Sequence, residues 1–551
     1  MDSGIIRRYI NDFKLSKWMK ERIPILDWLP KYDTKIDGPC DLIAGITVGI
    51  MHIPQGLGYA LMANVPPVVG MYMAFFPQLA YTPLGTSRHN SMGTFAVITL
   101  LVGKSVVVYA MNEDYQHDVT REINGTMITQ REMYTELEVG TTVTFFSGLW
   151  QMLLFALNLG AVSNLLSDAF VSSFIAGAGI HIFTSQIKEI VGVKIHHYIG
   201  PYNLPKVWRD LFKEVWNASP EQWTTIGIAL GISAVCFGLL ILTVIVIRPW
   251  LLKYTRVPFP AELILVVSGV FVATGLDLKE KYGTIDIGTI PTGLPAPQLP
   301  FYELGKVLML DSFVTAFVSY SITMSMGIIL AQGRNYVIDP NQELLALGVG
   351  NLFSCHFSCI AYGSSLSRSM VLNDVGGATQ LTGLTAAGLM VIVLLYIADF
   401  FEPLPRAVLA CIITVALREI FEQVADFPGF WRRKKLDGII WIAVFLIVVI
   451  VDVDIGLGIG FILSAAMIFR EGIKGTMCVL GNVPNTDIYL DIDNYKKACE
   501  VEGFKIISYR GGLVFATRDN FKKDLIKYSE LDPIREAKRL RKLAKRQAVC
   551  F

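Results

Sequence analysis

Two short polar stretches interrupt parts of the chain that are otherwise apolar enough to lie in a membrane. The first, TSRHNSMGTFAV, covers residues 86–97, and the second, SSLSRSMV, covers residues 364–371. Each is rich in serine and holds one arginine, Arg88 in the first and Arg368 in the second. A helix that begins at such a stretch exposes unpaired N–H groups in mid-membrane, and its dipole attracts negative charge. Two such helix starts facing each other would bind an anion with little formal charge.

The arginine of the second stretch has two interpretations. An arginine at membrane depth costs at least about 2.5–3.5 kcal/mol, and Arg368 either attracts an anion or extends its side chain to the inner surface. Its serine-rich surroundings favour the anion-binding role. Ser367 either donates to the anion or bonds its own backbone. Arg88 lies nearer the predicted inner surface, where we favour a structural role.

Other polar residues within apolar segments are candidates for the same site. Gln55 interrupts a helix, and Tyr59 follows four residues later, so both face the same side of that helix. Gln55 either lines the site or bonds a neighbouring helix. Glu262 follows two prolines at a helix start. It is either a dipole partner in the first turn or a charge-balancing or proton-coupling group beside the anion, and both interpretations stay open.

Several function classes are disfavoured by the sequence. The net charge of +1 gives no bias toward nucleic acid, and the eight cysteines form no CxxC pairs. We find no nucleophile–base pair and no metal-ligand spacing, so we expect no enzyme activity, no metal and no cofactor. GLGIGF, residues 456–461, lacks the context of a nucleotide loop and indicates close helix packing. Asp452 and Asp454 separate two apolar runs, and we expect them to mark the outer turn of a helical hairpin.

The elements that position these residues are predicted membrane-spanning helices. Hydrophobic residues make up 53% of the 551 residues and charged residues 17%, whereas soluble proteins carry about 25% charged residues. With about 20 apolar residues needed for each crossing, we expect an all-α protein that crosses the membrane about 14 times. The strong candidates are residues 41–63, 66–84, 139–160, 168–191, 222–248, 258–275, 311–331, 380–400, 402–418, 436–453 and 454–470, and the weaker ones are 91–110, 342–356 and a short piece that starts near Ser367.

Basic residues in the short loops predict the orientation. The N-terminal arm, residues 1–40, is rich in lysine and arginine, and we place it in the cytosol. Counting crossings from there puts loop 248–256, Arg334, the basic run 432–435 and the basic C-terminal tail on the cytosolic side as well. We therefore expect a multi-pass protein of the plasma membrane with both termini in the cytosol.

The predicted outer side carries two glycosylation sequons. Residues 111–138 contain Asn124-Gly125-Thr126, and residues 192–221 contain Asn217-Ala218-Ser219. Both fit N-glycosylation acceptors on an outer surface. The proline after the second sequon makes the use of Asn217 less favourable.

The chain repeats one plan in two halves. A helix opens at Asp41 and another at Asp311, and each is followed about 50 residues later by one of the polar stretches. If each half crosses seven times, an odd number, the two halves are inverted relative to each other. Short, broken, polar segments at matching positions of two such halves are typical of a transporter site.

Four ordered stretches carry a family resemblance. They are IPQGLGYALMANVPPVVGMY (53–72), GTSRHNSMGTFAV (85–97), NQELLALGVGNLFS (341–354) and SSLSRSMVLNDVGGATQLTG (364–383). The sequence at these residues resembles the sulfate-permease family of eukaryotic anion exchangers, the group that includes pendrin and prestin, and the likeness covers nearly the whole chain.

The resemblance implies two inverted repeats of seven segments, a mobile core domain and a gate domain, with an anion between the third and tenth helices. It also implies a homodimer and a cytosolic STAS domain. The positions that match the family's site are Gln55 and Tyr59 in the first helix, Phe95 before the third, Leu366, Ser367 and Arg368 in the tenth, and Glu262 near the site.

The C-terminal region departs from the family pattern. We expect a transmembrane domain over residues 41–470 and a partial α/β STAS-like region over 471–551. Residues 480–527 resemble the start of a STAS domain, but its later strands and helices do not follow, so its role in dimerisation is open. The basic tail either contacts anionic lipid headgroups or is a solvated helix.

The function that these features predict is coupled exchange of small anions: chloride, bicarbonate, iodide, sulfate or oxalate. Three alternatives remain: an uncoupled chloride conductance, a voltage-driven motor like prestin, and nucleobase transport on a related fold. The arginine and serines of the second polar stretch argue against nucleobase transport.

Overall fold

The structure is a computed structural model. It describes residues 22–123, 126–161, 167–196, 198, 200–251, 253–254, 258–473, 475–484, 486–515 and 517–549. Residues 1–21 of the predicted cytosolic arm and the sequon residue Asn124 lie outside this described part. The chain divides into two compact units, residues 1–461 and 462–551.

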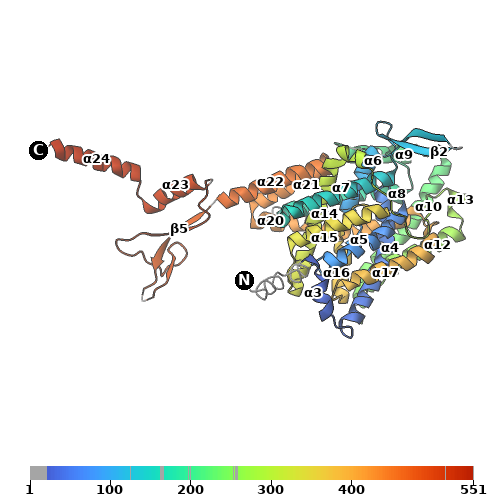
Figure 1. Cartoon of the computed structure of the whole chain (residues 1–551), viewed down its shortest axis with the longest axis horizontal. Helices are drawn as coiled ribbons and strands as arrows, with labels where there is room; N and C mark the ends of the chain where they lie inside the picture. Colours follow the sequence, from blue (N-terminus) through green and yellow to red (C-terminus); the bar gives the residue numbers. More distant parts are fainter. Residues whose placement is uncertain are drawn as a thin grey trace, which may run out of the picture. The chain divides into compact units, whose positions relative to one another are not determined.

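The first unit is built of helices (Figure 1). The longer ones are α4 (Asp37–Met62), α5 (Pro67–Leu84), α6 (Ala96–Tyr109), α7 (Glu136–Ala156), α8 (Asp168–Val191), α9 (Asn203–Trp216), α10 (Pro220–Leu242), α12 (Ala261–Gly275), α14 (Gly305–Arg334), α15 (Pro340–Ser354), α16 (Leu366–Val375), α17 (Leu381–Tyr396), α18 (Arg406–Ala416), α21 (Lys435–Ile450) and α22 (Val453–Ile473), the last of which continues into the second unit. The shorter ones are α3 (Ile25–Trp28), η1 (Leu29–Lys31), η3 (Thr243–Ile247), α11 (Arg248–Leu251), α13 (Leu278–Tyr282), η4 (Tyr302–Leu304), η5 (Cys355–Phe357), η6 (Ala398–Phe401), α19 (Arg418–Glu422), η7 (Gln423–Asp426) and α20 (Phe427–Arg433).

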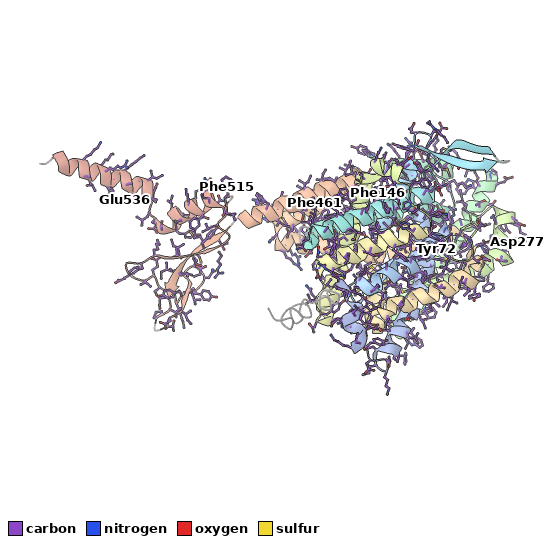
Figure 2. The ribbon with its side chains drawn as sticks, viewed as in Figure 1. Tyr72, Phe146, Asp277, Phe461, Phe515 and Glu536 are labelled. Carbon is purple, nitrogen blue, oxygen red and sulfur yellow. The ribbon has the colours of Figure 1, made fainter. Side chains whose placement is uncertain are left out.

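Each segment predicted to span the membrane coincides with a helix. Within the described residues, 6 helices are long and apolar enough to cross a membrane by length and composition, and shorter apolar helices such as α6, α12 and α17 accompany them. The chain is therefore mostly helical, as the sequence predicts. Tyr72 of α5, which is 5% exposed, lies amid the packed side chains of this unit (Figure 2).

Contacts sort the long helices into two groups. The first helix group consists of α4, α5, α6, α7, α14, α15, α16 and α17, and the second consists of α8, α10, α12, α18 and α21. Helix α22 lies against the second group, because a Cβ at Gly460 would meet Phe170 of α8 and Val444 of α21. The two groups touch where α4 contacts α12 and α18, and where α6 contacts α8.

Glycines allow the closest helix contact in the first group. A Cβ added to Gly70 of α5 would lie 1.9 Å from the carbonyl oxygen of Gly56 in α4. Small residues let helix backbones approach in this way inside a membrane. The close approach fixes the part of α4 that carries Gln55 and Tyr59.

A buried carboxylate holds the chain that leads into the first polar stretch. Glu343 of α15 accepts hydrogen bonds from the Thr86 amide and hydroxyl, both at 2.6 Å, and from the Ser87 amide at 3.1 Å. The Tyr81 hydroxyl donates to it as well, at 2.8 Å. Because these donors surround the buried Glu343, the path of the chain between α5 and α6 is fixed by side-chain chemistry.

The two segments that we predict to lie on the outer side contain secondary structure that the sequence did not indicate. The segment 111–138 forms an antiparallel hairpin of β2 (Gln116–Ile123) and β3 (Thr126–Met133), and the segment 192–221 contains α9. Strand β2 and helices α9 and α13 lie toward one end of the first unit, whereas α20, which carries the basic run, lies toward the other (Figure 1). Asn217 is exposed at the end of α9.

The second unit contains a small antiparallel sheet and two helices. Its strands are β5 (Thr476–Asn482), β6 (Tyr489–Asp491) and β7 (Ile506–Arg510), in the order β6-β5-β7. Helix α23 (Arg518–Ser529) packs Phe521 against Tyr509 of β7, with ring centroids 4.9 Å apart, and α24 (Pro533–Val549) follows. Phe515 and Glu536 mark this unit in Figure 2.

Candidate functional site

The two polar stretches lie directly against each other. Strands β1 (Met92–Gly93) and β4 (Gly363–Ser364) pair antiparallel, with Met92 opposite Ser364. Next to this pair, the Ser365 amide donates to the Ser91 carbonyl at 3.2 Å. Helices α6 and α16 therefore start from one antiparallel β pair, although about 270 residues separate them in the sequence.

Both helices begin without a side-chain cap. Phe95 precedes α6 and Ser365 precedes α16, and both have extended backbone angles. Neither side chain accepts a hydrogen bond from the first turn of its helix. The first N–H groups and the positive ends of the two helix dipoles are therefore available to a negatively charged ligand.

A small cavity of about 20 Å³ lies at these helix starts. Four of the predicted site residues line it: Tyr59, Phe95, Leu366 and Ser367. The other lining residues are Ile175, Met326, Ser365, Ala416, Leu417, Ile420 and Gln423. The volume holds one water-sized species. Because Ile175 belongs to α8 and Ala416 to α18, the cavity lies at the interface of the two helix groups.

Arg368 lies behind the cavity wall and is fully buried. Its guanidinium donates to the Gln55 side-chain oxygen at 2.9 Å, to the Thr94 carbonyl at 2.8 Å and to the Ser91 hydroxyl at 3.3 Å. Arg368 and Gln55 are thus brought together as predicted for one site, but neither lines the cavity. Of the two predicted residues on α4, Gln55 and Tyr59, only Tyr59 lines the cavity. Arg368 therefore acts on the cavity through its electrostatic potential and not by direct contact.

Glu262 completes the polar chain. The Gln55 amide donates to its carboxylate at 3.4 Å, so Gln55 bridges Arg368 and Glu262. Glu262 lies in the first turn of α12, in the second helix group, whereas Gln55 and Arg368 belong to the first. Its place in the first turn of α12 and its bond to Gln55 are compatible with both roles predicted for Glu262, which stay predictions.

Buried polar atoms near the helix starts lack protein partners. Within the described residues, the Thr94 hydroxyl and His52 Nδ1 make no hydrogen bond. Unpaired buried polar atoms usually mark a place for water or an ion. Both residues lie beside Arg368: its guanidinium donates to the Thr94 carbonyl, and the space at Gly93 is shared by His52 and Arg368.

A larger cavity, about 240 Å³ in volume, opens at the same interface. It reaches α9, because Asn203, Leu204 and Val207 of that helix are among its lining residues. The charged residues that line it are Lys104, Lys188, Glu189, Arg406 and Asp452. Sequence reasoning did not link these residues, because they belong to separate segments.

One close helix contact separates the two cavities. Gly58 and Ile413 line the larger cavity, whereas their near neighbours Tyr59 and Ala416 line the smaller one. A Cβ at Gly58 would lie only 2.6 Å from Ile413 Cδ1. The contact between α4 and α18 therefore lies between the two cavities and separates them.

Two opposed half-helices at the interface of two helix groups, in a chain with several membrane-length apolar helices, define a helical membrane transporter. Residues 40–444 match the sulfate permease family. The chain is 35% identical to human prestin over 511 residues, which cover 93% of this chain and 67% of prestin. The chain belongs to the sulfate permease family.

Solved structures show the same fold. The overall structure of SLC26A9 superposes with a TM-score of 0.81 and 30% identity, covering 95% of this chain and 80% of that chain. Murine Slc26a9, described as an anion transporter in the inward-facing state, superposes with a TM-score of 0.78 and 29% identity, covering 96% of this chain and 85% of that chain.

Proposed function

We propose that this protein is a secondary active transporter that exchanges small anions across the plasma membrane by alternating access. The observation that carries the proposal is the pair of uncapped helix starts, at Phe95 and Ser365, that meet at the small cavity. Family membership and the likeness to the Slc26a9 anion transporter support it. The cargo class is chloride, bicarbonate, iodide, sulfate or oxalate.

The site binds an anion weakly, because its positive charge is partly offset by neighbouring protein groups. Arg368 supplies positive potential, but three of the five N–H donors of its guanidinium already bond Ser91, Gln55 and Thr94, and Glu262 offsets part of its charge through Gln55. The anion is therefore held mainly by helix N–H groups and by the hydroxyl of Ser367. Weak binding suits transport, because the ion must also leave.

The two helix groups provide the moving parts. We propose that the larger cavity is the outer access path and that the Gly58–Ile413 contact closes it from the anion site. If the first helix group slides against the second, the Gly58–Ile413 contact opens, and the anion site connects to the larger cavity. The reverse movement closes this contact again. A cavity of about 20 Å³ accepts one small ion, so larger anions require the helix groups to separate further.

The finer architecture follows the family. We propose about 14 crossings in two inverted repeats of seven, with the transmembrane domain over residues 41–470 and both termini in the cytosol. We also propose a STAS-like region over 471–551, a homodimer in contact with membrane lipid, and N-glycosylation at Asn124 and, less favourably, at the exposed Asn217.

Uptake into vesicles tests the function. Purified protein is reconstituted, and uptake of radiolabelled chloride and sulfate is measured with and without anion on the opposite side. Exchange predicts that uptake requires the opposing anion. Uptake that ignores it would refute exchange and select an uncoupled conductance.

The similarity to human prestin supports a second candidate, a voltage-driven motor. A voltage-dependent capacitance without anion flux would select that reading over exchange.

A further inference from the structure

A partly buried lysine on α6 is surrounded by acidic residues. Lys104 Nζ lies 2.8 Å from Asp452 Oδ2 and also pairs with Asp454. The side chains of Lys104 and Asp452 are 26% and 7% exposed. The next residue on α6, Ser105, donates to Asp311 of α14 at 3.3 Å. One lysine thus faces two carboxylates directly, with a third beside them.

These ion pairs join the two helix groups. Lys104 lies on α6, in the first helix group, which packs against α4, α7 and α14. Asp452 lies in the turn between α21 and α22, and Asp454 in the first turn of α22. That turn belongs with the second helix group, because α21 packs against α8 and the His181 side chain of α8 bonds the Val448 carbonyl at 2.8 Å.

The ion pairs lie at the opposite end of α6 from the anion site. Phe95 precedes the helix at the small cavity, and Lys104 follows nine residues later, about 13 Å along the axis at 1.5 Å per residue. Lys104 and Asp452 line the larger cavity and not the smaller one. Lys104 therefore does not touch an anion in the site, although the same rigid helix carries both.

We propose that Lys104, Asp452 and Asp454 form an ion-pair latch between the two helix groups at the predicted outer end, which opens and re-forms once in every transport cycle. The proposal rests on the anion exchange proposed above. A partly buried ion pair is costly to break, since each charge must regain water or another partner. The latch holds the outer ends of α6 and α22 together, and Lys104 acts as a positioning residue that sets the rate of exchange.

Cross-linking tests the proposal. Lys104→Cys and Asp452→Cys are combined, and a short reversible bifunctional thiol reagent joins them in reconstituted protein. We expect the cross-link to lower labelled-anion exchange at least tenfold, and reduction to restore it. In variants that carry only one of the two introduced cysteines, treatment with the reagent should leave exchange at the level of the same variant without reagent.

A second ion pair provides a matched control. Lys279 Nζ and Asp286 Oδ2 lie 2.6 Å apart. Both flank the second helix group, since α13 contacts α10 and α12, and Asp286 bridges to Pro405 before α18. Cross-linking Lys279→Cys to Asp286→Cys should leave exchange unchanged, because this pair does not join the two groups.

The outcomes separate the latch from the transport function. Full exchange with a cross-link at 104 and 452, verified by mass spectrometry, would overturn the latch and make the ion pairs a fixed contact. Absence of exchange in the unmodified protein would refute the proposed function and the latch with it.

Substitution of Lys104 gives a test that needs no cross-link. We expect Lys104→Gln to change turnover per surface transporter at least fivefold. Lys104→Arg, which keeps the charge, should have the turnover of the wild type. A purely structural role would lower the amount of folded protein without changing turnover per molecule. Wild-type turnover in a folded Lys104→Gln protein would overturn the proposal.

Discussion

Replacing Arg368 by glutamine removes the positive charge behind the two helix starts. The guanidinium donates to the carbonyl of Thr94, the neighbour of Phe95, and Arg368 follows Ser367 in the chain. Phe95 and Ser367 line the cavity. The charge is therefore close to a bound anion without touching it.

The size of the effect depends on the distance between the guanidinium and the bound anion. At a separation of about 7 Å and an effective dielectric constant of about 20, one unit charge attracts an anion by roughly 2.4 kcal/mol. Glu262, joined to Arg368 through Gln55, offsets part of this attraction. We therefore expect Arg368→Gln to weaken anion binding by about ten- to thirtyfold, since each 1.4 kcal/mol is a factor of ten.

The assay is the half-saturation concentration of labelled chloride in vesicles, scaled to the amount of folded protein. Arg368→Lys is the control that keeps the charge and should retain most of the affinity. Arg88→Gln is the control on the other polar stretch, where the exposed arginine lies over the Tyr336 ring at 5.5 Å from its centroid. An unchanged half-saturation concentration in Arg368→Gln would refute the role of its charge.

Three further substitutions test the cavity and its supports. Phe95→Ala removes part of the apolar cavity wall, so larger anions should compete better with labelled chloride; an unaltered competition panel would contradict this. Glu343→Gln removes charge-assisted hydrogen bonds of a buried carboxylate, and we expect a loss of about 3 kcal/mol, measured as a lower thermal unfolding temperature in detergent. Gly70→Ala places a Cβ 1.9 Å from the Gly56 carbonyl oxygen and should reduce folded protein, whereas Gly227→Ala, with open space around it, should not; equal yields of the two variants would argue against tight packing of α4 on α5.

Local sequence pattern was sufficient to locate the long apolar helices and the two polar stretches, although not the amphipathic helix α9. Serine-rich segments such as 364–371 stand out within apolar surroundings, because membrane depth penalises polar groups. The matching positions of the stretches in the two halves predicted that the two helix starts face each other, but not that β1 and β4 pair between them. Of the site residues that line the cavity, Tyr59 and Ser367 were candidates from helix spacing and side-chain chemistry, whereas Phe95 and Leu366 came from the family resemblance alone, since an apolar residue carries no signal of its own.

Directions and distant partners could not be predicted in the same way. Gln55 and Tyr59 share a helix face, but one turn of the helix separates them, so Tyr59 reaches the cavity while Gln55 reaches Arg368. Lys104 is a lone charge in an apolar helix, a signal that was present in the sequence. Its partner Asp452 lies 348 residues away, and only the folded chain shows that Asp452 and Asp454 do more than mark a turn.

The β1–β4 pair has a consequence for how new selectivity can arise. Its partners are joined through main-chain atoms, at Met92 with Ser364 and Gly93 with Gly363, and such bonds do not depend on side-chain identity. Mutations at the tips of α6 and α16 can therefore alter the chemistry presented to a cargo while the two tips keep their spacing. An ancestral scaffold of this kind could diversify toward new cargoes by exchanging a few side chains, without first losing its ability to fold.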